Sequence, residues 1–355
     1  MASINIKALL KNVVAYKASD LHLVSRSEPQ IRIDGKLVPL DMDKLDGNII
    51  EEICYTLITD KQKKKLEEEK ELDFAIMFPD IGRFRANYYY TMGSELAAAF
   101  RIIPIDIPSL DELNTPPVFK DVIQREKGLI LVTGPTGSGK STTLAALLNE
   151  INLYEHRHVI TIEDPVEFIH QNKKALFSHR NVGDDTKSFA RALKFSLRED
   201  PDVILVGEMR DQETISTAIT AAETGHLVMG TLHTNSAVQT INRIVDSFEG
   251  AEQVQVRNML ASSLYAVISQ SLLPKIGGGR VAIHEIMINN APIANLIREN
   301  KMHQIYSQMQ LNQQKTGMIT QTQAMMKHLR ANLISKEDAI RYSTQPQELL
   351  NNMGI

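Results

Sequence analysis

The chain has 355 residues, 43% of them apolar and 23% charged, which is enough apolar material for the cores of two domains. Its net charge of −4 argues against a protein that mainly coats nucleic acid, and its single cysteine, Cys54, rules out an intrachain disulfide framework and a cysteine zinc site. No apolar run approaches the ~20 residues that span a bilayer, and Lys7 and Lys11 interrupt the N-terminal apolar stretch, so we expect a cytoplasmic chain without a membrane span or signal peptide.

Residues 1–103 are predicted to form one domain. Residues 31–38 alternate apolar and polar side chains around Asp34–Gly35, which is a β-hairpin pattern. Apolar residues at period two predict further strands at Phe84, Ala86, Tyr88, Tyr90, Phe100 and Ile102. Residues 49–57 are predicted to be helical. Residues 61–71 are dominated by Lys and Glu and predict a solvated helix, with a basic docking patch as the alternative.

Three arginines in this domain are candidates for phosphate contact. Arg83 and Arg85 share one face of a predicted strand, opposite Phe84, and Arg101 follows Phe100. A guanidinium is a rigid, permanently charged fork that suits phosphate. The alternative is a solvent-facing strand edge with no role in catalysis.

Four prolines predict a linker at residues 104–117, because proline fixes φ and disfavours helix in the preceding residue. From residue 118 to 355 apolar β-branched runs alternate with helical segments. This alternation predicts a doubly wound α/β domain with a parallel sheet. From Ala251 to Pro274 the spacing of apolar residues predicts a helix, and a mostly helical tail follows.

The stretch Gly134–Ser141 fits the phosphate-loop pattern G-x-x-x-x-G-K-[ST], between a predicted strand at 129–132 and a predicted helix at 142–150. Its glycines leave backbone N–H groups open to a polyphosphate, and the helix N-terminus adds partial positive charge. Lys140 would reach the β- and γ-phosphates, and Ser141 would ligate Mg²⁺, so we predict binding of a nucleoside triphosphate with Mg²⁺. The predicted nucleotide-binding residues are Gly134, Pro135, Thr136, Gly137, Ser138, Gly139, Lys140, Ser141 and Thr142.

Two acidic sites follow predicted strands of the same sheet. Glu163 lies among three acids in residues 160–167, where an acid could orient or deprotonate the attacking water. Acids that cap a turn are the alternative. The apolar run 203–206 ends in Gly207–Glu208, a Walker B pattern with Gly in place of the usual Asp. Glu208 would therefore act on Mg²⁺ or its waters, or else is an acid at the edge of a core strand.

Two histidines bracket the next predicted strand. His226 precedes residues 227–229 and His233 follows them. A histidine at the far end of this strand could sense or stabilise the γ-phosphate, whereas the alternative is an ordinary hydrogen-bonded histidine. Neither fits a zinc motif such as H-E-x-x-H.

In this order, the motifs resemble those of the secretion ATPases of type II, type IV pilus and related systems: phosphate loop, acidic box at 162–168, Gly-Glu Walker B, and histidine box at 225–233. The similarity extends to residues 18–23. Within that family the chain is similar to the retraction, or twitching-motility, branch, because it is short and lacks the four-cysteine zinc motif. Asn295–Glu299 also resembles the second half of a retraction-specific segment, although Pro292–Ala294 departs from the first half.

The resemblance implies a RecA-like P-loop ATPase domain, a smaller α+β PAS-like N-terminal domain and a helical C-terminal tail. It implies that Glu163 activates water and that Glu208 is the Walker B glutamate acting on Mg²⁺, directly or through a water. It also implies that the remaining catalytic residues are His226 and His233 of the histidine box and, as arginine fingers entering a neighbouring subunit's site, Arg85 and Arg101, with Arg83 as a third candidate.

The resemblance further implies a homohexamer at the inner face of the cytoplasmic membrane, at the pilus base. The expected partners are an inner-membrane platform protein of the PilC kind and a PilU-like paralogue, with no nucleic acid. Three alternatives stay open within the family: an accessory retraction ATPase, a pilus assembly ATPase and a type II secretion ATPase. Alternatives of other classes are a RecA-like nucleic-acid motor and a nucleotide-gated scaffold with vestigial hydrolysis.

Overall fold

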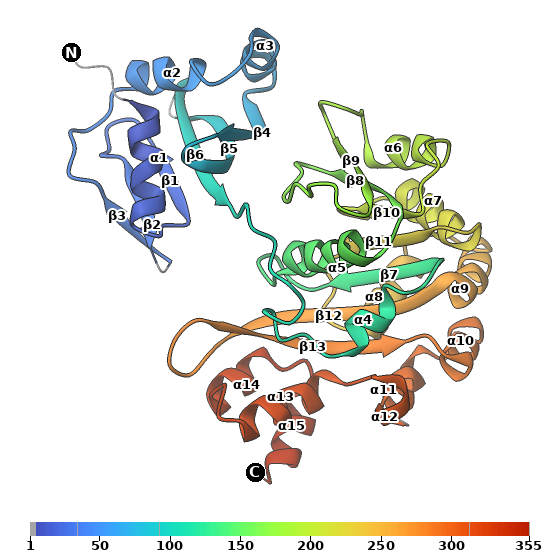
Figure 1. Ribbon diagram of the computed structural model, residues 1–355. Coiled ribbons are helices and arrows are strands. Elements are labelled where there is room, and N and C mark those ends of the chain that lie inside the picture. Colours follow the sequence, from blue (N-terminus) through green and yellow to red (C-terminus); the bar gives the residue numbers. More distant parts are fainter. Residues whose placement is uncertain (1–4, 34, 92, 312, 355) are drawn as a thin grey trace. The chain divides into compact units, whose positions relative to one another are not determined.

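The computed structural model of the chain describes residues 5–33, 35–91, 93–311 and 313–354. Internal contacts divide the chain into two units, Met1–Asp106 and Ile107–Ile355, here called the first and second units. Figure 1 labels their helices and strands along the chain. Within the described ranges no helix is both long and apolar enough to cross a membrane.

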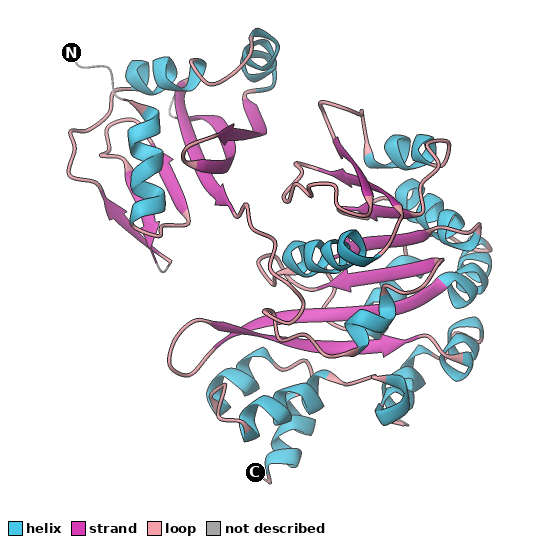
Figure 2. Ribbon diagram, in the orientation of Figure 1, coloured by secondary structure: helices cyan, strands magenta, loops and turns pink. Residues whose placement is uncertain are grey.

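In its described residues the first unit combines one antiparallel sheet with three helices (Figure 2). Its elements in chain order are α1 (Ile6–Ala15), β1 (Asp20–Leu23), β2 (Gln30–Ile33), β3 (Lys36–Pro39), α2 (Gly47–Tyr55), α3 (Asp60–Glu69), β4 (Glu71–Phe78), β5 (Gly82–Thr91) and β6 (Glu95–Ile103). The strand order across the sheet is β3-β2-β1-β6-β5-β4.

Alternating burial explains why the strands of the first unit are visible in the sequence. On β5, Phe84, Ala86 and Tyr88 are fully buried, and the ring of Tyr88 lies 5.1 Å from that of Phe74 in an edge-to-face contact. The intervening residues face the other side of the sheet. The period-two prediction for β5 is therefore confirmed. The predicted hairpin is confirmed by the antiparallel pairing of β2 with β3, although Asp34 of its turn lies outside the described residues.

The predicted solvated helix is α3. Thr59 and Gln62 form a capping box at its start, and Leu66 is its one fully buried side chain within the described helix. Its exposed face carries the i,i+4 pairs Lys64–Glu68, at 3.9 Å, and Lys65–Glu69, at 3.8 Å. The predicted solvated face is confirmed, and the cap and the buried Leu66 are found in the structure alone.

The second unit is built on a seven-stranded sheet that helices cover on both faces (Figures 1 and 2). Its elements are α4 (Val118–Val122), β7 (Gly128–Thr133), α5 (Lys140–Tyr154), β8 (His158–Glu163), β9 (Leu176–Asn181), α6 (Phe189–Ser196), β10 (Val203–Val206), α7 (Gln212–Glu223), β11 (Leu227–Leu232), α8 (Ala237–Val245), α9 (Glu252–Ser263), β12 (Leu264–Pro274), β13 (Arg280–Ile288), α10 (Ala291–Arg298), the 3-10 helix η1 (Met302–Gln304), α11 (Ile305–Met309), α12 (Gln313–Thr316), α13 (Gln321–Arg330), α14 (Lys336–Tyr342) and α15 (Pro346–Met353).

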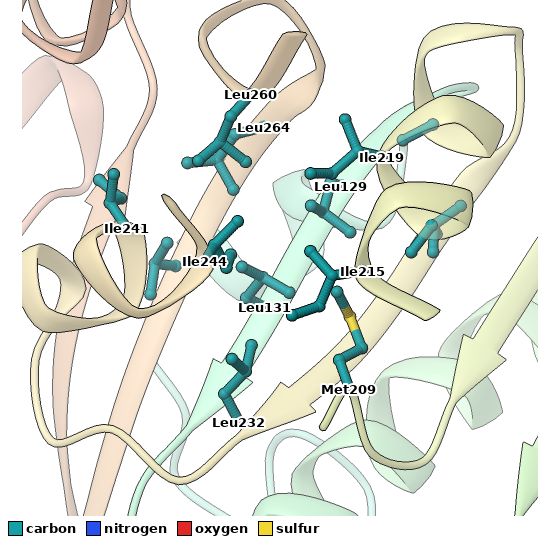
Figure 3. Packing of buried hydrophobic residues seen from close by; sticks show 14 of the residues in the cluster. Leu129, Leu131, Met209, Ile215, Ile219, Leu232, Ile241, Ile244, Leu260 and Leu264 are labelled. Carbon is teal, nitrogen blue, oxygen red and sulfur yellow. The ribbon is translucent and has the colours of Figure 1, made fainter. Parts of the chain in front are cut away.

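The strand order is β13-β12-β7-β11-β10-β8-β9, with every neighbouring pair parallel except β12 and β13. Alternate residues of β7 point to opposite faces of the sheet. Leu129 and Leu131 pack with α7, α8 and α9, as Figure 3 shows, whereas Ile130 and Val132 pack on the side of α4 and α5. A strand buried on both faces is apolar throughout, and the predicted doubly wound α/β fold is confirmed.

The helix predicted for residues 251–274 is wrong in its second half. α9 ends at Ser263, and Leu264–Pro274 forms β12 between β7 and β13. Because β12 is buried on both faces, its apolar residues do not alternate with polar ones. Val267 and Ile268 then satisfy a helical spacing by chance, while their β-branched side chains suit a strand. The predicted helical tail is confirmed from Ala291 onwards.

One buried carboxylate ties two helices of the second unit to the sheet. Glu285 on β13 is 2% exposed and accepts hydrogen bonds from the backbone N–H groups of Ala237, at 2.8 Å, and Gln321, at 3.3 Å. These are the first residues of α8 and α13. Burial raises the pKa of Glu285, and the two N–H donors oppose that shift, so one buried carboxyl group holds the starts of both helices.

Candidate active site

The phosphate loop joins β7 to α5, the strand and helix that the sequence predicts around it. Gly137 and Gly139 have φ of +78° and +88°, a conformation that L side chains rarely adopt. Gly139 immediately precedes α5 and has no side chain to cap it, so the first N–H groups of the helix remain available to an anion. The geometry of the loop therefore fits a phosphate chain.

Lys140 is 9% exposed and lies inside this loop. Its Nζ donates to the carbonyl oxygens of Gly134, at 2.9 Å, and Pro135, at 3.1 Å. Burial lowers the pKa of Lys140, and the nearby carboxylates of Glu208 and Glu167 oppose that shift. The lysine thus lies beside the loop backbone, where a polyphosphate would offer it stronger, charged acceptors.

Glu163 and Ser141 line one small pocket beside the loop. Glu163 is the last residue of β8 and Ser141 the second of α5, and both border the pocket together with Gly207, Thr231 and His170. The Glu163 Oε2 atom accepts a hydrogen bond at 3.2 Å from the backbone N–H of Glu167. The carboxyl ends of β8, β10 and β11 meet at this edge of the sheet, which is where ligands bind in open α/β folds.

Glu208 is held by two cationic or polar partners. Its Oε1 atom lies 2.9 Å from the Nε2 atom of His233 and forms an ion pair with Arg210. Burial raises the pKa of Glu208, but the hydrogen bonds and charges of Arg210 and His233 outweigh burial, and the net pKa lies below the ordinary value. Glu208 is therefore a carboxylate at neutral pH.

The two predicted histidines lie at opposite ends of β11. His233 follows the strand and contacts Glu208, whereas His226 precedes it and its Nδ1 atom lies 3.0 Å from the carbonyl oxygen of Ala221. The carbonyl of His226 accepts from the N–H of Gly128, at the start of β7. A strand of this length separates the two histidines by roughly 20 Å. The structure therefore brings His233, but not His226, to the glutamates of its own chain.

The predicted arginines lie on adjacent strands of the first unit. Arg85 on β5 is directly opposite Arg101 on β6. The Arg85 Nε atom donates to both carboxylate oxygens of Asp73, at 3.1 and 3.0 Å, and the Arg101 Nε atom donates to Asp20 at 2.7 Å. Arg83 is 8% exposed. Within the first unit, Arg85 and Arg101 are thus each bonded to a carboxylate on a neighbouring strand.

The sequence matches the family described as Type II/IV secretion system protein over residues 2–278, more than three quarters of the chain. The chain belongs to this family. The family match agrees with the site. Its phosphate loop, the acids at the ends of β8 and β10 and the histidine after β11 resemble those of a type II/IV secretion ATPase.

Three relatives of this secretion ATPase are informative. It is 48% identical over 343 residues to the type IV pilus retractation ATPase PilT of Pseudomonas aeruginosa, covering 97% of this chain and 99% of that protein. It is 36% identical over 342 residues to the type IV pilus ATPase PilU of the same organism, covering 96% and 89%. A crystal structure of the pilus retraction motor PilT with bound ADP superposes with a TM-score of 0.91 at 48% identity, covering 98% and 99%. The chain is a nucleotide-binding ATPase.

Sequence reasoning missed two residues of this secretion ATPase that contact its motifs. Arg210 pairs with Glu208, and the signal was a basic residue two positions after the acid. Gln270 on β12 contacts the phosphate loop through Ser138, 132 residues earlier in the chain. No local signal identifies Gln270, because it is that far from the loop and lies in a segment that the sequence predicts to be helical.

Proposed function

We propose that this chain is the ATP-hydrolysing motor that powers retraction of a type IV pilus. The observation that carries the proposal is its 48% identity to PilT, a retraction ATPase, across nearly the full length of both chains. The phosphate loop between β7 and α5 supports ATP as the fuel.

The chemistry is assigned to residues around the pocket of the second unit. Lys140 and the loop amides would hold the triphosphate. Glu163 would take a proton from a water as the water oxygen bonds to the γ-phosphorus and the bond to ADP breaks. Ser141 would hold Mg²⁺ through its hydroxyl and Glu208 through a bound water, since Mg²⁺ prefers oxygen ligands and Glu208 is ionised. Bound Mg²⁺ would neutralise phosphate charge, and His233 would keep the Glu208 carboxylate in position.

The active assembly in this proposal is a homohexamer, with residues 1–103 as a PAS-like domain and residues 104–117 as a flexible linker. Residues 104–117 form no helix or strand, although Leu110 is buried in the core of the second unit. Arg85 and Arg101 would enter a neighbouring subunit's site, with Arg83 as a further candidate. To do so, Arg85 and Arg101 would exchange Asp73 and Asp20 for phosphate oxygens.

The proposed location is the cytoplasmic face of the inner membrane at the pilus base, against a PilC-like platform protein. Force would pass through the helix α10, where Asn290 caps the start and Pro292 occupies the first turn. Ile297 of α10 is buried while Arg298 is exposed, so the helix offers a charged outer face to a partner. A PilU-like accessory role is the second candidate, supported by the 36% identity to PilU.

Deletion of the gene tests the proposal. We expect cells with more surface pili and no twitching motility, because pili would still assemble but would not retract. Loss of pili would identify an assembly ATPase instead. Normal motility in the deletion strain would point to the accessory role. In a separate assay, ATPase activity stimulated by DNA would favour a nucleic-acid motor.

A further inference from the structure

One side chain from outside the sequence motifs contacts both the phosphate loop and the first turn of α5. Gln270 lies on β12, next to β7, and is 5% exposed. Its Nε2 atom donates to the carbonyl oxygen of Ser138 at 2.7 Å. Its Oε1 atom accepts from the hydroxyl of Thr143, also at 2.7 Å. A buried amide that is hydrogen-bonded at both ends has a defined orientation.

His284 on β13 reinforces that orientation. Its Nε2 atom lies 3.2 Å from the Oε1 atom of Gln270, and its ring packs edge-to-face on Phe119 at 5.0 Å. Burial lowers the pKa of His284 to about 4, so the ring is neutral at pH 7. Because its neighbour is a carbonyl oxygen, the neutral ring carries its proton on Nε2 and donates. If the Gln270 amide were rotated by 180°, its oxygen would face the Ser138 carbonyl oxygen and its NH₂ group would face the N–H of His284. Neither hydrogen bond could then form.

The loop approaches β12 so closely that only glycine fits at two of its positions. A Cβ atom on Gly134 would lie 2.1 Å from the backbone carbonyl oxygen of Gln270, and one on Gly139 would lie 2.8 Å from the side-chain Nε2 atom of Gln270. Both glycines are therefore required by contact with Gln270 as well as by backbone conformation. Gly134 thus fits against the backbone of β12, and Gly139 fits against the Gln270 side chain.

The bond to Ser138 controls the direction of the next N–H group. In a trans peptide the C=O and N–H groups point in opposite directions, so a Ser138 carbonyl held toward β12 turns the Gly139 N–H away from β12. Backbone N–H groups of such loops bind phosphate oxygens. We propose that Gln270 is a positioning residue for phosphate binding, which holds the Ser138–Gly139 peptide so that the Gly139 N–H faces the nucleotide. The inference rests on the proposed role of the loop in binding ATP.

Two substitutions test it. Gln270→Met has a similar volume but no donor, and Gln270→Glu keeps the acceptor for Thr143 and His284 but cannot donate to Ser138. We expect the dissociation constant for ADP, measured by calorimetry on the full chain, to rise about tenfold in the methionine variant, since one buried hydrogen bond and its geometry are lost. The glutamate variant should bind more weakly still. KM for ATP should rise more than kcat falls, because the contact is made before and during the reaction.

Thr143→Val is the matched control. It removes the other partner of Gln270 but leaves the bond to Ser138, so its affinity for ADP should stay within about twofold of the wild type. Gln270→Asn keeps an amide one methylene too short to reach Ser138, and it serves if the other two variants do not fold. Wild-type affinity for ADP in any folded Gln270 variant overturns the positioning role. Failure of the wild-type chain to bind ADP would instead contradict the proposed function.

Discussion

The two units of this protein hold their candidate catalytic charges in different ways. In the second unit Lys140, Glu163 and Glu208 come from three separate segments, and the parallel strands bring them to one edge of the sheet. In the first unit Arg85 and Arg101 are each bonded to a carboxylate of their own sheet. Topology alone explains the first arrangement, whereas local ion pairing already explains the second. The glutamates therefore need a test of chemistry, and the arginines need a test of subunit exchange.

The largest expected effect is on the second unit. Lys140→Ala should reduce ATP hydrolysis by on the order of 10³-fold or more, because it would remove from a buried position the charge that we propose contacts the phosphates. Steady-state release of phosphate measures it. Lys127→Ala is the matched control, since Lys127 is exposed and precedes β7. Equal activity of the two variants would show that Lys140 is not needed for ATP hydrolysis in the second unit.

The arginines should show the next largest effect, and only through a neighbour. Arg101→Ala should lower kcat by about 10³-fold if the guanidinium acts as an arginine finger. Mixing it in equal amounts with Lys140→Ala should restore activity at about one quarter of the sites of a ring, those that pair an intact lysine with an intact neighbouring arginine. Arg26→Ala, which removes an exposed pair with Glu95, is the control. No recovery in confirmed mixed hexamers would mean that Arg101 serves its own sheet.

Glu163→Gln should lower kcat by about 10²–10⁴-fold while ADP and ATP still bind, because the amide cannot accept the proton of the attacking water. Phosphate release and equilibrium binding are measured on the same preparation. Glu249→Gln, at an exposed position after α8, should behave as the wild type. Full turnover in the Glu163 variant would show that convergence at the sheet edge is structural and leave water activation to another group.

The ion pair of Asp20 predicts how the stability of the first unit depends on pH. Burial raises the pKa of Asp20, but hydrogen bonds from Ser19 and Arg101 outweigh burial and leave the pKa below its ordinary 3.8. A carboxyl whose pKa is lowered by folding adds stability above its unfolded pKa and loses it as the pH falls toward the folded pKa. The melting temperature should therefore decrease once the pH is lowered beyond about 4.

Asp20→Asn should remove this acid-dependent part and lower the melting temperature at pH 7 by about 2–4 °C. The measurement is a pH series of thermal unfolding for the wild type and the variant. His22, whose pKa is lowered mainly by burial, adds a separate loss of stability that begins nearer its ordinary value of 6.5. An unchanged acid limb in the Asp20→Asn variant would show that a group other than Asp20 causes the loss of stability in acid.

The smallest effect is expected at the surface of α3. Lys64→Gln breaks an i,i+4 pair with Glu68 whose side chains are 77% and 66% exposed. Solvent screens such pairs, so the free energy of unfolding should change by less than about 0.5 kcal/mol. Chemical denaturation measures it. A larger loss would mean that Lys64 contributes more to the stability of α3 than a solvent-screened pair does.

How much the sequence predicts depends on whether the signal is local. The phosphate loop and the strand-end acids Glu163 and Glu208 lie in short contiguous motifs, and β5 alternates because one face is buried. β12 is buried on both faces, and its apolar residues fit a helix equally well. The partners Asp20 and Gln270 are brought to their targets by strand pairing between segments distant in the chain, so no spacing along the chain reveals them.

The buried carboxylate of Glu285 has a consequence for any shortened version of this protein. A chain cut before Gln321 would remove one of the two N–H donors of Glu285 and leave a buried carboxyl oxygen without that partner beside α8. α8 follows directly on the segment that carries His233. A C-terminal truncation would therefore disturb the nucleotide site indirectly, through α8. Lost hydrolysis in such a chain would not mean that the deleted helices take part in catalysis.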